Sequence, residues 1–280
     1  MVPHEPAIVT DSAASLPPEQ VAALGIIVVP FTLVLGTTLY ADNRISTEEV
    51  ARRSAIESLS TSAPSPGEWL SAMRSCGGRR VVAITVSATV SASFQSALMA
   101  TRSLPPGQVA VVDSRTAAGA QGLVVAAAAR AAAAGVGFDR VVTEAERASA
   151  DARFIGCIEQ FDALARSGRV PGVAAWAGRS LGLIPVFEFR SGAARPRRPA
   201  INPDRALSRL VEACTRGCNS SLHCLEATVM EVGATKIATE LYARLQSRFP
   251  AAHITSCAVS SVVVAHTGLG VWGVAWRWTP

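Results

Sequence analysis

The first half of the chain alternates short apolar runs with helix-forming segments, and this alternation is the strongest constraint on its fold. Apolar runs at 7–10, 81–86 and 109–113 each end in a polar turn, and helix-forming residues follow each turn. Repeated strand–turn–helix units indicate a parallel sheet with helices on both faces. Residues 26–35 also have the composition of a strand, despite Pro30.

Local signals predict where several helices begin and end. Ser65 and Glu68 flank Pro66 in a capping-box pattern, so a helix is expected to begin at Pro66. Thr61 and Ser62 would then lie in the loop that leads into this helix. Helices are also expected at 46–59, from Ser93 onwards, and in the Ala-rich segment that ends at Gly135.

The pattern changes after about residue 160. Strands are expected at 183–189, 224–232 and 253–266, helices at 161–178, 204–214 and 235–249, and a Pro- and Arg-rich loop at 191–205. We therefore expect an α/β fold of two domains with a ligand tunnel between them. The N-terminal parallel-sheet α/β/α domain would cover residues 1–160, and a C-terminal α+β domain would cover residues 161–280.

Composition excludes several classes of protein. Hydrophobic residues make up 49% of the chain, charged residues 17% and aromatic residues 5%, with a net charge of +5. Such a chain can bury a sizeable core, but it lacks the stacked aromatics and dense basic stripe of a nucleic-acid-binding protein. The apolar run 26–36 is too short to span a membrane, and 119–137 contains Gln121 and Arg130. We expect neither nucleic-acid binding nor integral membrane association.

The six cysteines lie at positions 76, 157, 214, 218, 224 and 257. The N-terminal residues lack the pattern of a secretory signal, so we expect free thiols in a cytoplasmic protein. Cys214, Cys218, His223 and Cys224 are close in sequence, but their spacing is not that of common zinc sites. Buried apolar cysteines are the preferred interpretation, and we expect no metal.

Polar turns rich in Ser and Thr are the main candidates for a binding site. Ser93 is expected in the first turn of a helix, and Thr61 and Ser62 precede another helix. Hydroxyls beside the N–H groups of a helix N-terminus favour a carboxylate or phosphate. The alternative is ordinary helix capping by each residue alone. Asp11 and Asp113 also follow strands, and we expect both to organise turns.

His266 follows an apolar run and precedes a Gly-rich turn, which suits either a functional histidine or a surface histidine beside a hairpin. Gly178, Ser180 and Gly182 match the G-x-S-x-G pattern of serine hydrolases. That pattern requires a strand before it and a helix after it, and the opposite order is expected here. Arg190, Arg195, Arg197, Arg198 and Arg205 form either a solvated basic loop or a docking patch for an acidic partner.

Taken in order, these segments resemble the DegV family. The resemblance covers the opening segment 8–49, the Thr-Ser-x-Pro-Ser loop at 60–69, and the Ser-rich turn at 87–97. It also covers the Val-Val-Asp-Ser segment at 111–114, the stretch 161–189, and the terminal His-x-Gly motif at 265–273. Each motif alone is weak, but their order over nearly the whole chain is specific.

The resemblance implies two α/β domains that hold a long-chain fatty acid between them, and no other cofactor. It implies a carrier rather than an enzyme: bacterial members present the bound carboxylate to a separate fatty-acid kinase subunit, which forms acyl phosphate. By motif, Thr61, Ser62, Ser93 and His266 would contact the carboxyl group, and Thr267 and Gly268 would shape the turn. Arg169 and Arg198 would be candidates for contact with the partner.

The chain departs from the family pattern at a few positions. Ala88 and Ala92 stand where the family has Ser and Gly, Ser167 replaces the first Gly of Gly-Gly-Arg, and Leu269 replaces a Pro. Two other functions remain open at this point. One is a serine-dependent lipid hydrolase or acyltransferase that uses His266, and the other is a sensor of a small anion without lipid.

Overall fold

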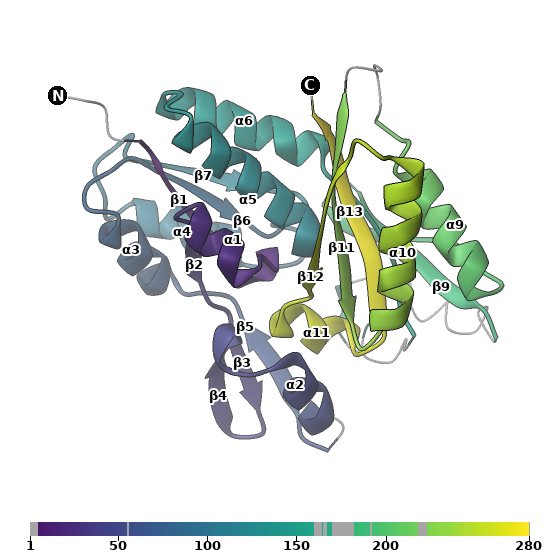
Figure 1. Ribbon diagram of the computed structural model, residues 1–280. Helices are drawn as coiled ribbons and strands as arrows, with labels where there is room; N and C mark the ends of the chain where they lie inside the picture. Colours follow the sequence, from purple (N-terminus) through teal and green to yellow (C-terminus); the bar gives the residue numbers. More distant parts are fainter. Residues whose placement is uncertain are drawn as a thin grey trace.

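The computed structural model describes residues 5–54, 56–159, 164, 167–169, 182–190, 192–217 and 223–279. These residues form a four-stranded, a six-stranded and a three-stranded sheet. Figure 1 shows the two larger sheets side by side, with the small sheet projecting from their lower edge. The expected α/β architecture, with a parallel-sheet domain and a second domain built on a mixed sheet, is confirmed.

The four-stranded sheet is parallel throughout and has the order β2-β1-β6-β7. Its strands are β1 (Ala7–Asp11), β2 (Ile27–Val29), β6 (Val81–Thr85) and β7 (Val109–Asp113). The runs predicted as strands at 7–10, 81–86 and 109–113 are therefore confirmed. All residues of β1 and β6 are buried, as expected for parallel strands covered on both faces.

Helices cover both faces of this sheet. Trp69 of α3 (Pro66–Ser75) and Ala97 of α4 (Ser93–Thr101) pack on one face. The other face carries α1 (Pro18–Ala23), α5 (Ala118–Ala133) and α6 (Phe138–Asp151). Helix α3 begins with the predicted capping box: the Ser65 hydroxyl accepts from the Glu68 N–H, and the Glu68 carboxylate accepts from the Ser65 N–H at 2.7 Å.

The six-stranded sheet has the order β10-β9-β8-β13-β11-β12 and is antiparallel except for the pair β11–β12. Its strands are β8 (Arg153–Cys157), β9 (Ile184–Arg190), β10 (Ala193–Ala200), β11 (Cys224–Val232), β12 (His253–Ala258) and β13 (Val271–Thr279). Helices α9 (Pro203–Ala213) and α10 (Thr235–Arg248) cover its outer face. Strand β8 belongs to this sheet although it precedes residue 160. The expected domain boundary at residue 160 stays a prediction.

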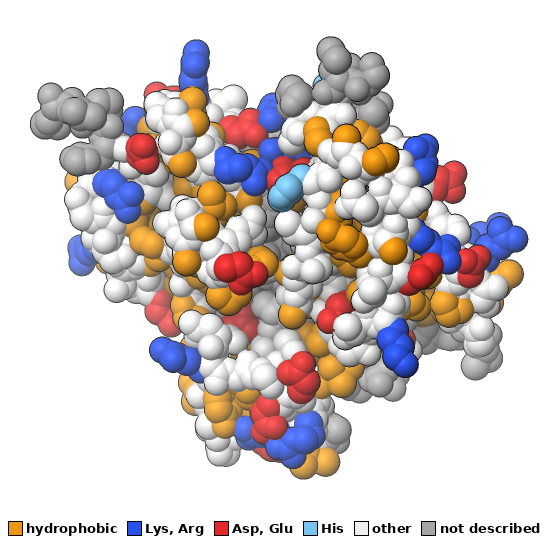
Figure 2. Space-filling model, viewed as in Figure 1, with side chains coloured by type: hydrophobic (Ala, Val, Ile, Leu, Met, Phe, Trp, Pro, Cys, Tyr) orange, Lys and Arg blue, Asp and Glu red, His pale blue; other side chains and the backbone are white. Residues whose placement is uncertain are grey.

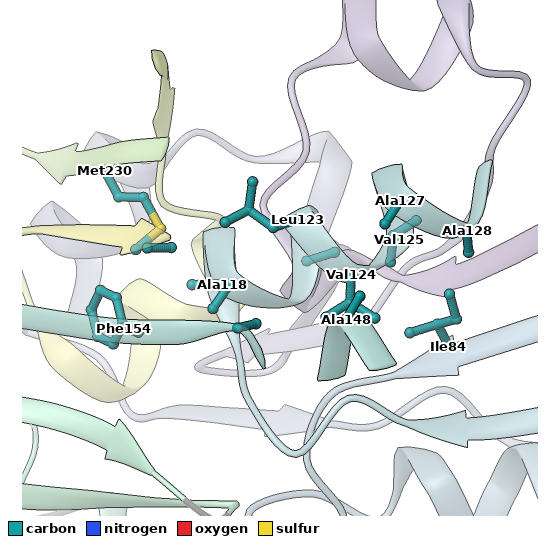
Figure 3. Packing of buried hydrophobic residues seen from close by; sticks show 14 of the residues in the cluster. Ile84, Ala118, Leu123, Val124, Val125, Ala127, Ala128, Ala148, Phe154 and Met230 are labelled. Atoms are coloured by element: carbon teal, nitrogen blue, oxygen red, sulfur yellow. The ribbon is translucent and has the colours of Figure 1, made fainter. Parts of the chain in front are cut away.

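Helix α5 lies between the two large sheets and contacts both of them. Thirteen of its 16 residues are buried. Figure 3 shows how its Ala and Val side chains pack toward Ile84 of the first sheet, while Ala118 lies near Phe154 of the second. Small side chains allow this close approach from both directions, which explains the Ala-rich sequence.

The small sheet corrects the expectation of one strand over 26–35. Pro30 separates β2 from β3 (Thr32–Leu35), and the two strands belong to different sheets because proline donates no backbone hydrogen bond. Strands β4 (Thr38–Ala41) and β5 (Leu59–Ser62) complete the small sheet. Thr61 and Ser62 thus lie at the end of a strand rather than in a loop. The 3-10 turn η2 (Asp42–Arg44) and helix α2 (Thr47–Ser54) connect β4 to β5.

Two expectations for the second half are wrong. The segment expected to be a loop contains the edge strand β10, where Arg and Pro are tolerated because one side of the strand needs no partner. The segment 253–266 is not one strand, because β12 is followed by helix α11 (Ser261–Thr267). A short apolar run such as Val262–Val264 fits a strand or a buried helix equally well. The helix expected at 161–178 lies mostly outside the described residues.

Within the described ranges, no helix is both long and apolar enough to cross a membrane. The face of the molecule in Figure 2 carries basic and acidic side chains interspersed over both halves. This face therefore presents no continuous basic stripe.

Gly273 of β13 is expected to resist substitution. A Cβ there would lie 2.6 Å from the Ile155 carbonyl oxygen and 2.7 Å from the Gly156 Cα, and backbone atoms cannot move aside easily. Gly273→Ala should lower the free energy of unfolding by about 1–3 kcal/mol in urea denaturation. Gly137→Ala is the control, because no atom lies within 4 Å of its added Cβ. An equal loss in both variants would contradict the packing argument.

Candidate functional site

A cavity of about 620 Å³ lies where the two large sheets and the small sheet meet. Its volume is in the range of small-molecule binding sites. Residues from both halves of the chain line it: the small sheet, the turn after β6, the start of α5, the inner face of the six-stranded sheet, and α11. A cavity is therefore present between the two halves of the chain, where the ligand tunnel was expected.

The inner face of the six-stranded sheet provides an apolar wall. Met230, Gly273, Gly156 and Phe187 are successive register partners across β11, β13, β8 and β9, so they form one row on one face. Phe154, in the next row, packs edge-on against Phe187 with ring centroids 5.4 Å apart. The Phe154 ring lies over the two glycines: a Cβ at Gly156 would lie 2.9 Å from its Cζ, and a Cβ at Gly273 would lie 3.1 Å from its Cε2.

Polar groups line another part of the same cavity. Nε2 of His266 lies 2.9 Å from the hydroxyl of Thr61, which joins α11 to the end of β5. The other polar lining residues are Ser62, Thr89, Ser91, Gln95, Arg169 and Thr267. The cavity is therefore amphipathic, with an extended apolar wall and one region rich in hydroxyl, imidazole and guanidinium groups.

His266 is neutral at neutral pH. Burial, and secondarily the positive charge of Arg169, lower the pKa of its imidazole from 6.5 to about 4. A neutral imidazole can donate or accept a hydrogen bond at Nε2, depending on its tautomer. The proximity of Arg169 supplies the positive charge that this part of the cavity would otherwise lack.

The segment that follows β4 of the small sheet also fixes the helix that carries His266. The N-cap residue of α11, Ser260, makes no side-chain capping bond. Instead, Oδ1 of Asp42 in η2 accepts from the backbone N–H of Val262 at 2.8 Å, and the Ser261 hydroxyl donates to the Ile45 carbonyl. Asp42 is almost fully buried, and burial raises its pKa to about 6. A carboxylate from a distant segment thus caps α11.

Ser93 does not line the cavity. It is fully buried at the start of α4, and its hydroxyl donates to Oδ2 of Asp11 at 2.7 Å. The Asp11 carboxylate also accepts from the Val86 N–H at 2.9 Å and from the Gln121 side chain at 2.9 Å. Burial raises the pKa of Asp11 despite these bonds. Ser93 is therefore placed to support the turn that borders the cavity, rather than to reach into it.

The two strand-end aspartates organise turns, as expected. Asp11 holds the beginning of the turn after β6 through Val86, and Oδ1 of Asp113 accepts from the N–H groups of Ala88 and Arg115. The same turn is tied to the second half, because the Ser87 hydroxyl donates to the Gly192 carbonyl at 2.8 Å. The cavity edge is thus fixed from both sheets.

The remaining predicted residues take different positions. Thr267 lines the cavity, and Gly268 ends α11 with a φ of 76°, which favours glycine. Ser62 is exposed at the cavity rim, where its hydroxyl donates to the Ala63 carbonyl. Arg198 is exposed on β10, and its carbonyl accepts from Arg209. Arg169, predicted as a partner contact, lies in the cavity lining beside His266.

Among the described residues, neither the cysteine cluster nor the hydrolase-like pattern forms a metal or catalytic site. Cys214 is fully buried and Cys224 half-buried, Cys218 falls outside the described ranges, and burial raises the pKa of the Cys214 thiol. No group of three or more His, Cys, Asp or Glu is placed to hold a metal there. Gly178 and Ser180 of the hydrolase-like pattern also lie outside the described ranges, and Gly182 has a φ of 74°.

Sequence reasoning missed three structural contributors to the site. Asp42 gave no signal, because its partner Val262 is 220 residues away. Met230 and Gln121 lie inside segments that read only as an apolar strand and an Ala-rich helix. Gln121 is a polar side chain in the first half of a helix that is otherwise apolar up to Arg130, and that exception was the one signal available.

Comparisons with known proteins agree on the family. The sequence profile of the DegV family, described as uncharacterised proteins, matches residues 5–278. A DegV domain-containing protein of Streptomyces coelicolor is 32% identical over 276 residues, covering 96% of both chains. One of Deinococcus radiodurans is 30% identical over 280 residues, covering 96% of this chain and 97% of the relative. A solved structure that describes fatty acid binding by a DegV family protein from Thermus thermophilus is 26% identical. It has a TM-score of 0.91 and covers 98% of this chain and 100% of that one.

His266→Gln should change how stability depends on pH. The unfolded histidine binds a proton near 6.5, but the folded one only near 4, so wild type loses stability as the pH falls between these values. The glutamine variant lacks this loss. Its free energy of unfolding should therefore rise relative to wild type as the pH is lowered, measured by urea denaturation. A difference that is constant with pH would show that His266 titrates normally.

Asp42→Asn should show the opposite trend. The folded carboxyl has a pKa of about 6 against an ordinary 3.8, so its burial costs wild type stability as the pH rises between these values. The variant keeps an oxygen acceptor for the Val262 N–H without the charge, and it should gain on wild type over that range. Asp42→Ala removes the acceptor and should lose about 1–3 kcal/mol. Equal behaviour of the two variants would exclude the capping role.

Proposed function

Because the chain belongs to the DegV family, we propose that it binds a long-chain fatty acid and presents the carboxyl group to a separate kinase subunit. In that reaction a carboxylate oxygen attacks the terminal phosphorus of a nucleoside triphosphate. The bond between this phosphorus and the leaving nucleoside diphosphate breaks. The sequence carries no GxxxxGK[ST] loop, and its GxGxxG run, Gly268–Gly273, follows helix α11 and enters strand β13. A nucleotide-binding GxGxxG follows a strand and opens a helix, so this run is not a phosphate-binding loop. The nucleotide and its metal would therefore belong to the partner, and this chain would act as a carrier without turnover of its own.

The amphipathic cavity is the observation that carries this proposal. Its apolar wall of Phe154, Phe187 and Met230 suits an acyl chain, and Thr61 and His266 suit a carboxyl group. Burial of each methylene contributes about 0.8 kcal/mol, so the chain would supply most of the affinity. A carboxyl group withdrawn from water needs hydrogen-bond partners, and the polar region supplies them. The Thermus thermophilus relative, described as binding fatty acid, supports the same use.

Each polar residue has a distinct proposed role. Thr61 and His266 would bind the carboxyl oxygens, Ser62 would contact the same group at the rim, and Thr267 with Gly268 would set the end of α11. Arg169 would balance the charge of the carboxylate, so it would serve the ligand as well as any partner. Ser93 would act through Asp11 by holding the turn after β6. Arg198 remains a candidate for docking the kinase subunit from the exposed strand β10.

We also propose that the protein is located in the cytoplasm. The five cysteines that the structure describes are free, which suits the reducing cytoplasm where a nucleotide-dependent kinase would operate.

A hydrolase or acyltransferase is the alternative, and it requires a nucleophile activated by His266. The hydroxyl nearest to Nε2 is that of Thr61, and no ion pair or hydrogen bond joins His266 to a carboxylate within the described part of the chain. A catalytic triad needs such a group to orient the imidazole. Labelling of the purified protein by a fluorophosphonate probe would favour the hydrolase.

Solvent extraction and mass spectrometry of the protein purified from a bacterial host test binding directly. We expect about one equivalent of a long-chain fatty acid per protein chain, because the proposed site is a single cavity. An extract that stays empty after incubation with free fatty acids would remove the proposed function and leave the fold intact.

Head-group variants test the presentation of the carboxylate. Thr61→Ala and His266→Ala should lower acyl phosphate formation with a DegV-dependent fatty-acid kinase about tenfold or more, and total lipid binding less, because the tail supplies most of the affinity. Thr143→Ala and His253→Ala, both on exposed surface away from the cavity, are the matched controls. Head-group variants that bind and support phosphorylation like wild type would show that the carboxyl group lies elsewhere.

A further inference from the structure

We propose that Met230, held in place by Gly119, sets the length of acyl chain that the cavity accepts. This inference rests on the proposed function and adds a determinant of specificity to it. Met230 lies on β11 in the apolar wall, and it is fully buried. Figure 3 shows its side chain directed toward the start of α5, close to Ala118.

An unusual contact fixes the Met230 side chain. Its sulfur lies 2.8 Å from the backbone nitrogen of Gly119, whose N–H points at it from the first turn of α5. Such a first-turn N–H has no partner within its own helix, so the sulfur satisfies a group that would otherwise be unpaired. Methionine is unbranched and flexible, and this bond selects one position for it.

A second hollow lies next to Gly119, the residue that the Met230 sulfur contacts. Ala118 and Met230 line the main cavity, whereas Gly119, Gly122 and Thr228 line this hollow of about 10 Å³. This hollow is too small for an acyl chain by itself. With the Met230 side chain shortened, the two spaces would join, and the cavity would extend between α5 and β11.

Because Gly119 has no side chain, the Met230 side chain can lie against the start of α5 instead of filling the main cavity. A Cβ at position 119 would lie 2.4 Å from the sulfur and 3.1 Å from Cγ of Met230. It would also approach the Thr228 methyl at 3.4 Å, which closes the route toward the second hollow. The backbone of Gly119 has no positive φ, so alanine fits the helix itself. Gly119→Ala would therefore push the Met230 side chain into the acyl space.

The rest of the wall is less adjustable. Gly273 and Gly156, the next residues in the row, have no side chains, and Phe187 is packed against Phe154. Met230 is the one long, unbranched side chain in this row, so it can adopt another rotamer when a neighbouring residue changes. One side chain, and the glycine that faces it, thus control how much acyl chain the wall can accommodate.

The experiment measures a length profile for delipidated wild type, Gly119→Ala, Met230→Ala and the double variant. Myristate, palmitate, stearate and arachidate are titrated against a bound fluorescent fatty acid. Each accommodated methylene changes affinity about fourfold. Relative to wild type, the affinity ratio of arachidate to myristate should rise about tenfold in Met230→Ala and fall about tenfold in Gly119→Ala. The double variant should return toward Met230→Ala, because the displaced side chain is gone.

Two further variants keep the test decisive. Met230→Leu nearly conserves volume and should keep the wild-type profile, and Met230→Val should shift it in the direction of Met230→Ala if the alanine variant does not fold. If wild type binds the acids and every variant has the same length profile as wild type, this inference is overturned and the proposed function stands. Failure of wild type to bind any of the four acids would overturn both.

Discussion

The packing of helix α5 between two sheets is the constraint on which the rest of the structure depends. One side of the helix covers the parallel sheet, and the other covers the mixed sheet, so most of its residues must be small and apolar. Its Gly residues let neighbouring segments of both halves approach closely: a Cβ at Gly122 would lie 2.9 Å from the Ala14 carbonyl oxygen in the turn after β1, and a Cβ at Gly119 would lie 2.4 Å from the Met230 sulfur of β11. The two α/β halves are therefore joined through a common hydrophobic core rather than a flexible linker.

The candidate site lies where this shared core ends. The start of α5 forms one wall, the six-stranded sheet forms another, and the small sheet with α11 contributes the polar groups. Each polar group is held by a contact from a distant part of the chain: His266 by Thr61, α11 by Asp42, and the turn after β6 by Asp11 and Asp113. The cavity is amphipathic because the six-stranded sheet supplies apolar surface, whereas β5, α11 and the turn after β6 supply polar groups.

The sequence predicted the features that depend on local signals. The buried strands of the parallel sheet, the capping box at Ser65 and the Ala-rich helix are set by composition over a few residues, and the structure confirms them. Strand β10 and helix α11 were missed because edge position and helix packing are properties of the tertiary fold. The family resemblance was confirmed because it used the order of motifs along the whole chain.

The candidate site was predictable only in part. Thr61, His266 and Thr267 do meet at the cavity, but nothing local separates them from Ser93, whose hydroxyl is taken by Asp11. Asp42 shows the limit most clearly, because its capping bond crosses 220 residues of sequence. A residue whose role is to position another residue leaves no pattern in its own neighbourhood.

The position of α5 also has a consequence for folding. The inner faces of both sheets pack against this helix in one hydrophobic cluster, so removing either sheet would expose part of the buried surface of the helix. We therefore expect the two halves to unfold in a single cooperative transition and to be unable to fold as separate fragments. Since the cavity is built on the same shared core, a bound ligand would stabilise the whole molecule against unfolding rather than one half of it.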